Sequence, residues 1–106
     1  WKRATAKFRL ALKHVPHPPH EASLRYYLGV ALMNLGSYKE AADELEAALK
    51  VGAEKSVSRE VRFHLGGIYE QIGQRRQAIR AYRAYIKRFP GTNYARAARR
   101  RVKALK

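Results

Sequence analysis

The sequence contains no cysteine, which excludes a disulfide framework and any thiol chemistry. It also lacks an apolar run of the ~18 to 20 residues that a membrane-spanning helix needs. The first ten residues, WKRATAKFRL, have no apolar core of the kind found in signal peptides. Because the chain begins with Trp1 rather than methionine, we expect it to be part of a longer protein.

Acidic residues are scarce. The chain has 8 Asp and Glu against 23 Lys and Arg, which gives a net charge of +15. Residues 55–106 hold 15 basic and 2 acidic side chains, so this half carries most of the excess charge. Nucleic acid, anionic lipid and acidic proteins are therefore the partner classes that the charge favours.

The patterns of catalytic sites are also missing. No serine lies in a Gly-x-Ser-x-Gly turn, and the pair Gly66-Gly67 lies in an apolar run of helical spacing rather than at a strand-to-helix turn that could hold a phosphate. His64 follows Phe63 in the same run, and we expect it to be packed or partly exposed rather than to act as a base. We therefore expect no enzyme and no cofactor.

The chain repeats itself with a period of 37 residues. The segment YYLGVALMNLG (26–36) aligns with FHLGGIYEQIG (63–73), and the positions after it also match across three copies. The aligned sets are Ala4, Ala41 and Ala78; Phe8, Leu45 and Tyr82; and Leu12, Leu49 and Ile86, each of the last set followed by a lysine. A period of this length is typical of helical repeat proteins.

Each copy contains two apolar patterns of helical spacing separated by a glycine, Gly36 or Gly73, which predicts a helix, a turn and a second helix. The predicted helices cover residues 1–14, 22–35, 38–51, 58–72, 75–88 and 93–105, with no strand. Ser37 and Glu40 have the spacing of a capping box at the start of the third helix. Since glycine inside a helix costs roughly 1 kcal/mol relative to alanine, Gly29 and Gly66 predict that the two helices of each copy approach closely.

These residues resemble tetratricopeptide repeats, whose signature is complete in one copy: Leu65, Gly66, Tyr69, Ala78, Tyr82 and Pro90. The resemblance implies an all-α, right-handed solenoid of antiparallel helix pairs over a single domain, residues 1–106. In that frame, residues 1–16 are the second helix of a truncated repeat, residues 22–53 and 59–90 are repeats, and residues 93–105 are a terminal helix or the start of a further repeat. The tail around FPGTNYA also resembles bacterial envelope repeats of the outer-membrane assembly and Tol–Pal coordinator kind, which implies a bacterial protein. The sequence leaves its compartment open between the cytoplasm and the periplasm or cell envelope.

Proteins of this family bind a partner segment in a concave groove lined by the first helix of each repeat. By resemblance, that groove is lined here by Tyr26, Val30, Met33, Asn34, Phe63, Gly67, Glu70 and Gln71. The sequence therefore predicts an interaction scaffold that holds a peptide or helix of another protein. The alternative for these residues is that a neighbouring repeat covers them.

A second candidate surface is basic. It comprises Arg76, Arg80, Arg83 and Lys87 on one predicted helix and Arg96, Arg99, Arg100 and Lys103 on the last one. Arginine suits phosphate, so the alternative function is an adaptor for nucleic acid or anionic membrane. The acidic segment 38–51 interrupts a continuous phosphate track, however, and favours a solvated surface or one that faces an acidic protein.

Two further features concern the ends of repeats. The stretch HVPHPPH (14–20) overlays the joints between copies, and its prolines predict a polyproline-like extension that spaces His14, His17 and His20 too far apart for one metal ion. We therefore expect no metal site there. Apolar residues near the ends, namely Trp1, Phe8 and Val102, predict self-association through the open ends of the solenoid.

Overall fold

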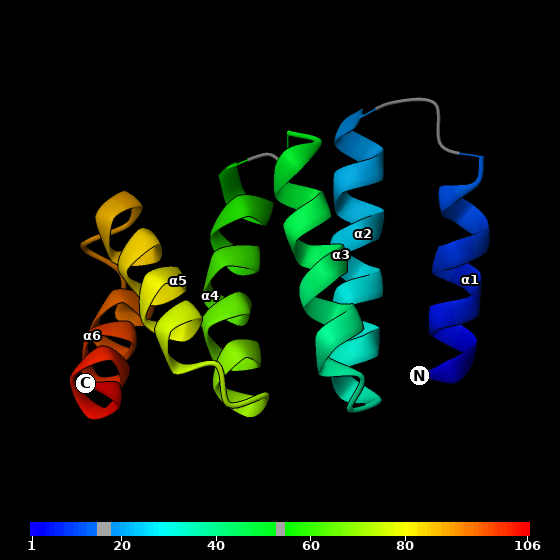
Figure 1. Cartoon of the computed structure of the whole chain (residues 1–106). Coiled ribbons are helices and arrows are strands. Elements are labelled where there is room, and N and C mark those ends of the chain that lie inside the picture. The colour runs from blue at the N-terminus through cyan, green and yellow to red at the C-terminus, as the bar shows by residue number, and fades with distance from the viewer. Residues whose placement is uncertain (15–17, 53–54) are drawn as a thin grey trace. The chain divides into compact units, whose positions relative to one another are not determined.

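The computed structural model describes residues 1–14, 18–52 and 55–106, and within these ranges the chain forms six α-helices and no strand (Figure 1). The helices are α1 (Lys2–Leu12), α2 (Pro18–Asn34), α3 (Tyr38–Lys50), α4 (Lys55–Gln71), α5 (Arg75–Arg88) and α6 (Asn93–Leu105). The predicted all-α class is therefore confirmed.

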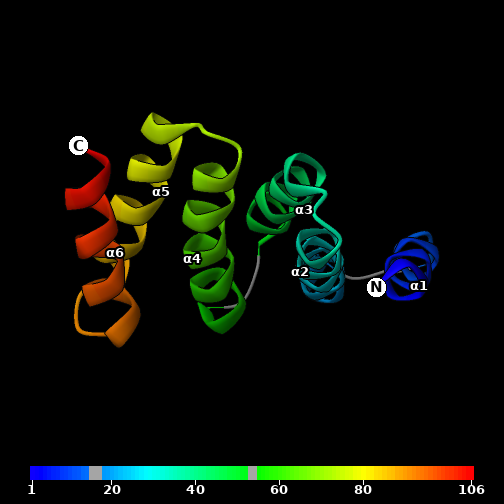
Figure 2. The ribbon, with the colours of Figure 1, turned by 90° about the horizontal axis from the view of Figure 1, so that it is seen from below.

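Contacts divide the chain into two compact units, with the boundary inside α4: unit 1 covers Trp1–Val61 and unit 2 covers Arg62–Lys106. In unit 1, α2 packs against both α1 and α3 (Figure 2). In unit 2, α5 packs against α6. Each unit thus contains a pair of helices joined by a short turn together with parts of the adjoining repeats.

Gly36 and Gly73 end the first helix of each pair. Both have positive φ angles, 82° and 76°, in the left-handed region that favours glycine. The amide after each glycine returns to a carbonyl inside the helix, with Ser37 N to Leu32 O at 2.9 Å and Gln74 N to Tyr69 O at 2.9 Å. This bond satisfies a carbonyl that the helix end leaves without a partner. The predicted turns are confirmed.

The glycines inside α2 and α4 mark the closest approach of each helix pair. A Cβ added at Gly29 would lie 2.7 Å from Leu45 Cδ2, and one added at Gly66 would lie 2.6 Å from Tyr82 Cδ1. Real Cβ atoms do not come this close to another side chain. The predicted close approach is confirmed, and the group that fills the space is the residue at the shared repeat position, Leu45 or Tyr82.

Apolar burial follows the helical periodicity in the cores of both units, while the large apolar side chains that are exposed in the described part of the chain are Trp1, Leu10, Tyr27, Leu35 and Tyr94. Leu28 and Ala31 of α2 are buried as their pattern predicts, but Leu35 is 38% exposed because α2 ends at Asn34 and Leu35 lies beyond it. Val102 was predicted to contribute to an open apolar end. It is 8% exposed instead, since it packs in the cluster that α5 and α6 share.

The structure at the start of α2 differs from the extended conformation that the stretch HVPHPPH predicts. Pro18 and Pro19 belong to the first turn of the helix, so the expected polyproline-like extension is wrong for residues 18–20. Proline fits there because the first amides of a helix have no intrahelical acceptor to lose. His14 lies in the turn after α1, His20 lies in α2, and both are exposed. Residues 15–17, including His17, lie outside the described part of the chain.

The predicted capping box at α3 does not form. The Ser37 side chain makes no cap hydrogen bond, and the Glu40 carboxylate binds Arg9 instead. Ser37 has ψ of 65° rather than the extended backbone usual at this position. Thr92, before α6, has that extended backbone with ψ of 160°, and its hydroxyl accepts a hydrogen bond from Ala95 N at 3.1 Å.

Candidate interaction surfaces

In unit 1, the predicted groove residues lie along α2. Tyr26, Val30 and Met33 are partly buried, while Asn34 is exposed and its Nδ2 donates to Val30 O at 2.9 Å. The exposed aromatic of this helix is Tyr27, which is 51% exposed. Tyr27 was not among the predicted groove residues, although the doubled tyrosine is visible in the sequence.

The Tyr27 ring joins α2 to α1. It stacks on Phe8 with centroids 5.8 Å apart and planes at 23°, and it lies 5.5 Å from the Tyr26 ring at a tilt of 51°. Because Phe8 lies against Tyr27, it is half-buried rather than a free apolar end, whereas Trp1 is 62% exposed.

In unit 2, Phe63 of α4 faces α6. Its ring centroid lies 4.4 Å from Tyr94 of α6, at an interplanar angle of 33°. It also lies 5.9 Å from the Tyr85 ring and 6.4 Å from the Tyr82 ring, both edge-on. Offset and edge-on ring pairs of this kind add ≈ 0.5–1.5 kcal/mol beyond the area that they bury. Phe63 is therefore partly covered, while Tyr94 remains 43% exposed.

Glu70 lies about two helical turns after Phe63 on α4 and is part of a polar network. Its carboxylate accepts a hydrogen bond from Tyr82 Oη at 2.8 Å and one from Arg101 Nε at 2.9 Å, and it forms an ion pair with the same arginine. Burial alone would raise the pKa of Glu70, but the hydrogen bonds from Arg101 and Tyr82 outweigh it and lower that pKa. Burial and the bond to Glu70 raise the pKa of the Tyr82 phenol above its ordinary value.

The contacts of α4 with α6 follow a seven-residue spacing. Phe63 and Glu70 are seven residues apart, and so are their partners Tyr94 and Arg101. Gly67 lies between them on α4, and a Cβ added there would have only Tyr82 Oη nearby, at 3.9 Å. The fourth predicted residue of this helix, Gln71, is exposed. We call Phe63, Gly67, Glu70, Tyr94 and Arg101 the α4–α6 face.

Family models of the tetratricopeptide repeat match the chain at residues 1–56 and again at residues 60–92. The chain belongs to the tetratricopeptide repeat family. A comparison with curated proteins found no match. Tetratricopeptide repeats commonly mediate protein–protein interactions, which makes another protein the expected class of partner. The resemblance to bacterial envelope repeats remains a prediction.

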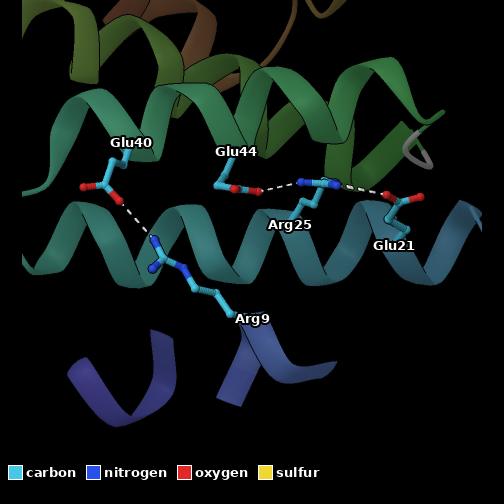
Figure 3. Close-up of polar contacts among 5 residues, drawn as sticks. All are labelled: Arg9, Glu21, Arg25, Glu40 and Glu44. Atoms are coloured by element: carbon cyan, nitrogen blue, oxygen red, sulfur yellow. Dashed lines mark hydrogen bonds and ion pairs between the residues drawn. The ribbon is translucent and has the colours of Figure 1, made fainter. Parts of the chain in front are cut away.

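Both repeats carry arginine, Arg25 and Arg62, where the family often has tryptophan. Arg25 bridges two carboxylates within unit 1 (Figure 3): Nη1 donates to Glu44 at 2.9 Å, and Nη2 donates to Glu21 at 3.1 Å. Burial alone would lower the pKa of Arg25, but these two hydrogen bonds outweigh it and raise that pKa. The bridge therefore joins α2 to α3 with a charge where an aromatic ring is usual.

A second ion pair of unit 1 is more exposed. Arg9 of α1 donates from Nη2 to Glu40 of α3 at 3.0 Å, with about half of each side chain or more in solvent (Figure 3). Exposed pairs of this kind contribute ~0.2–1 kcal/mol.

All eight residues of the predicted basic surface are exposed on the two helices expected to carry them. On α6, the guanidinium of Arg99 donates to Pro90 O at 3.2 Å. On α5, three of the arginines and one isoleucine line a shallow hollow: Arg76, Ile79, Arg80 and Arg83.

The described residues contain no cluster of three or more His, Asp or Glu side chains that could hold a metal ion. In that same part of the chain, no helix is both long and apolar enough to span a membrane.

Proposed function

We propose that this tetratricopeptide repeat chain is a scaffold, not an enzyme, and that it holds an extended or helical segment of another protein on the faces of its first helices. The single observation that carries this proposal is the α4–α6 face of unit 2. There, the Phe63–Tyr94 ring pair leaves Tyr94 43% exposed, and the neighbouring Gly67 presents backbone without a side chain.

The chemistry of this face favours one kind of ligand group. An exposed aromatic ring beside a site without a side chain accepts an apolar side chain of the partner, which gains from removing apolar surface from water. Glu70 and Arg101 bind each other at the far end of the face. Because their polar groups already have partners, this pair forms a polar boundary at one end of the apolar site. In unit 1, we propose the same role for Tyr26, Val30, Met33 and Asn34.

The test uses a library of displayed peptides selected on the wild-type chain, followed by measurement of the affinity of the selected peptides for two variants. Tyr94→Ala removes the exposed ring, and Gly67→Leu fills the space beside it. We expect each variant to weaken binding by about tenfold or more, because groups at the centre of an apolar site contribute most of the affinity.

The matched control is Gln77→Ala, which changes an exposed residue of α5 that belongs neither to the predicted groove nor to the α4–α6 face. Circular dichroism verifies that all three variants remain helical. If the selected peptides bind Tyr94→Ala and Gly67→Leu as tightly as the wild type, the α4–α6 face is not the binding site.

A further inference from the structure

The outer side of α5 carries four exposed cations in one stripe: Arg76, Arg80, Arg83 and Lys87. Residues seven apart on a helix lie nearly above one another and are separated by about 10.5 Å along the axis. The stripe therefore consists of two parallel rows of cations, each with two members seven residues apart. We call these four residues the arginine stripe.

The repeat itself supplies a comparison for this stripe. The 37-residue register aligns it with four residues of α3: Lys39, Asp43, Glu46 and Lys50. At the same structural positions, unit 1 thus carries two positive and two negative charges, whereas unit 2 carries only positive ones. The helix pair folds with either pattern, so its packing does not require four cations there.

The arginine stripe costs stability rather than adding to it. Like charges three or four residues apart on a helix destabilise it by ~0.2–0.5 kcal/mol per pair. Arg76 with Arg80, and Arg83 with Lys87, are such pairs. In unit 1 the aligned pairs are Lys39–Asp43 and Glu46–Lys50, and both have opposite charges. The same repeat position can therefore carry a charge pattern that destabilises the helix less.

Unit 2 has no free carboxylate to neutralise these charges. Residues 62–106 contain 13 Lys and Arg and a single acidic residue, Glu70. That carboxylate is occupied by Tyr82 and Arg101. The counter-charge for the stripe must therefore come from outside the unit.

An apolar edge runs beside the cations. Ile79 contributes to the hollow that the three arginines line, and Ile86 lies seven residues further along the same side. Both are only partly buried against the core of unit 2. A partner helix with an apolar row flanked by carboxylates matches this edge and these charges, because arginine binds carboxylates through two parallel hydrogen bonds.

Nucleic acid fits the surface less well. Phosphate-binding surfaces also use hydroxyl and amide side chains and free backbone amides. Unit 2 offers the amides of Gln74 and Gln77 beside Arg76, but it contains no serine. The hydroxyl of its one threonine, Thr92, already bonds with Tyr85, Phe89 and Ala95. A phosphate backbone also offers no aliphatic side chain to Ile79.

We propose that the arginine stripe of α5, with Ile79 and Ile86 at its edge, binds an acidic amphipathic helix of a partner protein. This surface lies on the second helix of its repeat and shares no residue with the α4–α6 face. The binding of a partner to the arginine stripe therefore does not depend on the function proposed above, and the two proposals are tested separately.

The decisive variant is Arg80→Asp/Arg83→Glu, which gives α5 the mixed charge pattern of α3. Since it replaces like-charge pairs by opposite-charge pairs, we expect the variant to remain folded with an unfolding midpoint equal to or above that of the wild type. The probe is a synthetic peptide of about 20 residues with leucines at helical spacing and glutamates on both flanks. Binding is measured by fluorescence anisotropy at low and at physiological salt.

We expect the wild type to bind this peptide, and the α5 variant to bind it about tenfold or more weakly, because two attractive pairs become repulsive. The matched control is Arg96→Asp/Arg100→Glu, which makes the same change of net charge on α6. We expect the control to lose less than about threefold, which is the effect of the overall field alone.

Several outcomes would overturn the proposal. Equal losses in the α5 and α6 variants would mean that only net charge matters. Equal binding of a twin peptide with glutamine in place of glutamate, or no binding of the acidic peptide at low salt, would exclude the carboxylate contacts. Tighter binding of duplex DNA or of phosphatidylserine vesicles, lost in the α5 variant, would identify the stripe as a phosphate-binding surface instead.

Discussion

Units 1 and 2 build the same helix pair around different side chains. In unit 1, Leu45 fills the space over Gly29, and in unit 2, Tyr82 fills the space over Gly66. The tyrosine adds a hydroxyl that must find a partner, and it binds Glu70 at 2.8 Å. Glu70 in turn holds Arg101 of α6. One change at a shared repeat position therefore turns a purely apolar contact into the centre of a polar network.

The two units also differ in how they use charge. Unit 1 neutralises Arg9 and Arg25 with carboxylates of its own helices. Unit 2 has one carboxylate for 13 cations and uses it inside the network. The mixed charges of unit 1 support its own helices, whereas the four cations of the arginine stripe in unit 2 are exposed.

The largest expected difference between the units is the loss of stability when the glycine inside the first helix is replaced by alanine. Gly66→Ala would place a methyl group against the rigid Tyr82 ring, so we expect it to lower the free energy of unfolding by about 2 kcal/mol even after the gain in helix propensity. Gly29→Ala should cost less, because the end of the Leu45 side chain can rotate away. Urea unfolding followed by circular dichroism measures both.

The adjacent glycine is the matched control for this pair. At Gly67 an added Cβ has only Tyr82 Oη nearby, at 3.9 Å. Gly67→Ala should therefore stabilise the chain, by up to ~1 kcal/mol, through helix propensity alone. A stabilising Gly66→Ala would contradict the close approach of α4 and α5.

The second difference is the tyrosine hydroxyl. Tyr82→Phe keeps the ring over Gly66 and removes the hydrogen bond to Glu70, so we expect a loss of about 1 kcal/mol in the free energy of unfolding. In a Glu70→Gln background the same substitution should cost less. A double-mutant cycle measures this coupling, and equal costs in both backgrounds would show that the bond does not contribute.

The pH dependence of stability tests the same network. Because the pKa of Glu70 in the folded chain lies below its ordinary value of 4.5, its contribution is complete above that value and is lost as the pH falls through the folded pKa. The wild type should therefore be more stable than Glu70→Gln near neutral pH, by less than about 1 kcal/mol given the exposed partner. Thermal unfolding from neutral to acidic pH should show this advantage disappear, and a constant difference would contradict it.

The smallest expected effects concern the ion pairs of unit 1. Arg9→Gln removes an exposed pair, and we expect it to change the free energy of unfolding by less than about 0.5 kcal/mol. Arg25→Gln removes three hydrogen bonds to two less exposed carboxylates, so it should cost about 1 kcal/mol. Equal values from urea unfolding would show that burial does not distinguish the two pairs.

Much of the fold could be read from the sequence because it depends on local and periodic features. The 37-residue period, the glycine turns at Gly36 and Gly73 and the small residues in the first helices each have a direct structural reason. Two predicted details are wrong for different reasons. Glu40 does not cap α3 because it binds Arg9, which is 31 residues away in another helix. Pro18 starts a helix instead of extending a linker, because the first turn of a helix tolerates proline.

The candidate site was less accessible to sequence reasoning. The residues of α4 were predicted from the family pattern, but Tyr94 and Arg101 were not predicted as their partners. Both contacts span 31 residues from α4 to α6, and no periodic signal in the chain links those positions. The family match supports a binding function, while the predicted groove residues remain predictions.

The amino-acid sequence alone determined three properties: the helix pairs, the repeat family and the strong excess of positive charge. Each of them follows from residue spacing and composition. The partner of each side chain depended on tertiary structure. Tyr82 meets Glu70, Phe63 meets Tyr94, and the cations of α5 meet no carboxylate of unit 2, because packing brings together residues that are distant along the chain. Those pairings decide which side chains are satisfied internally and which stay exposed.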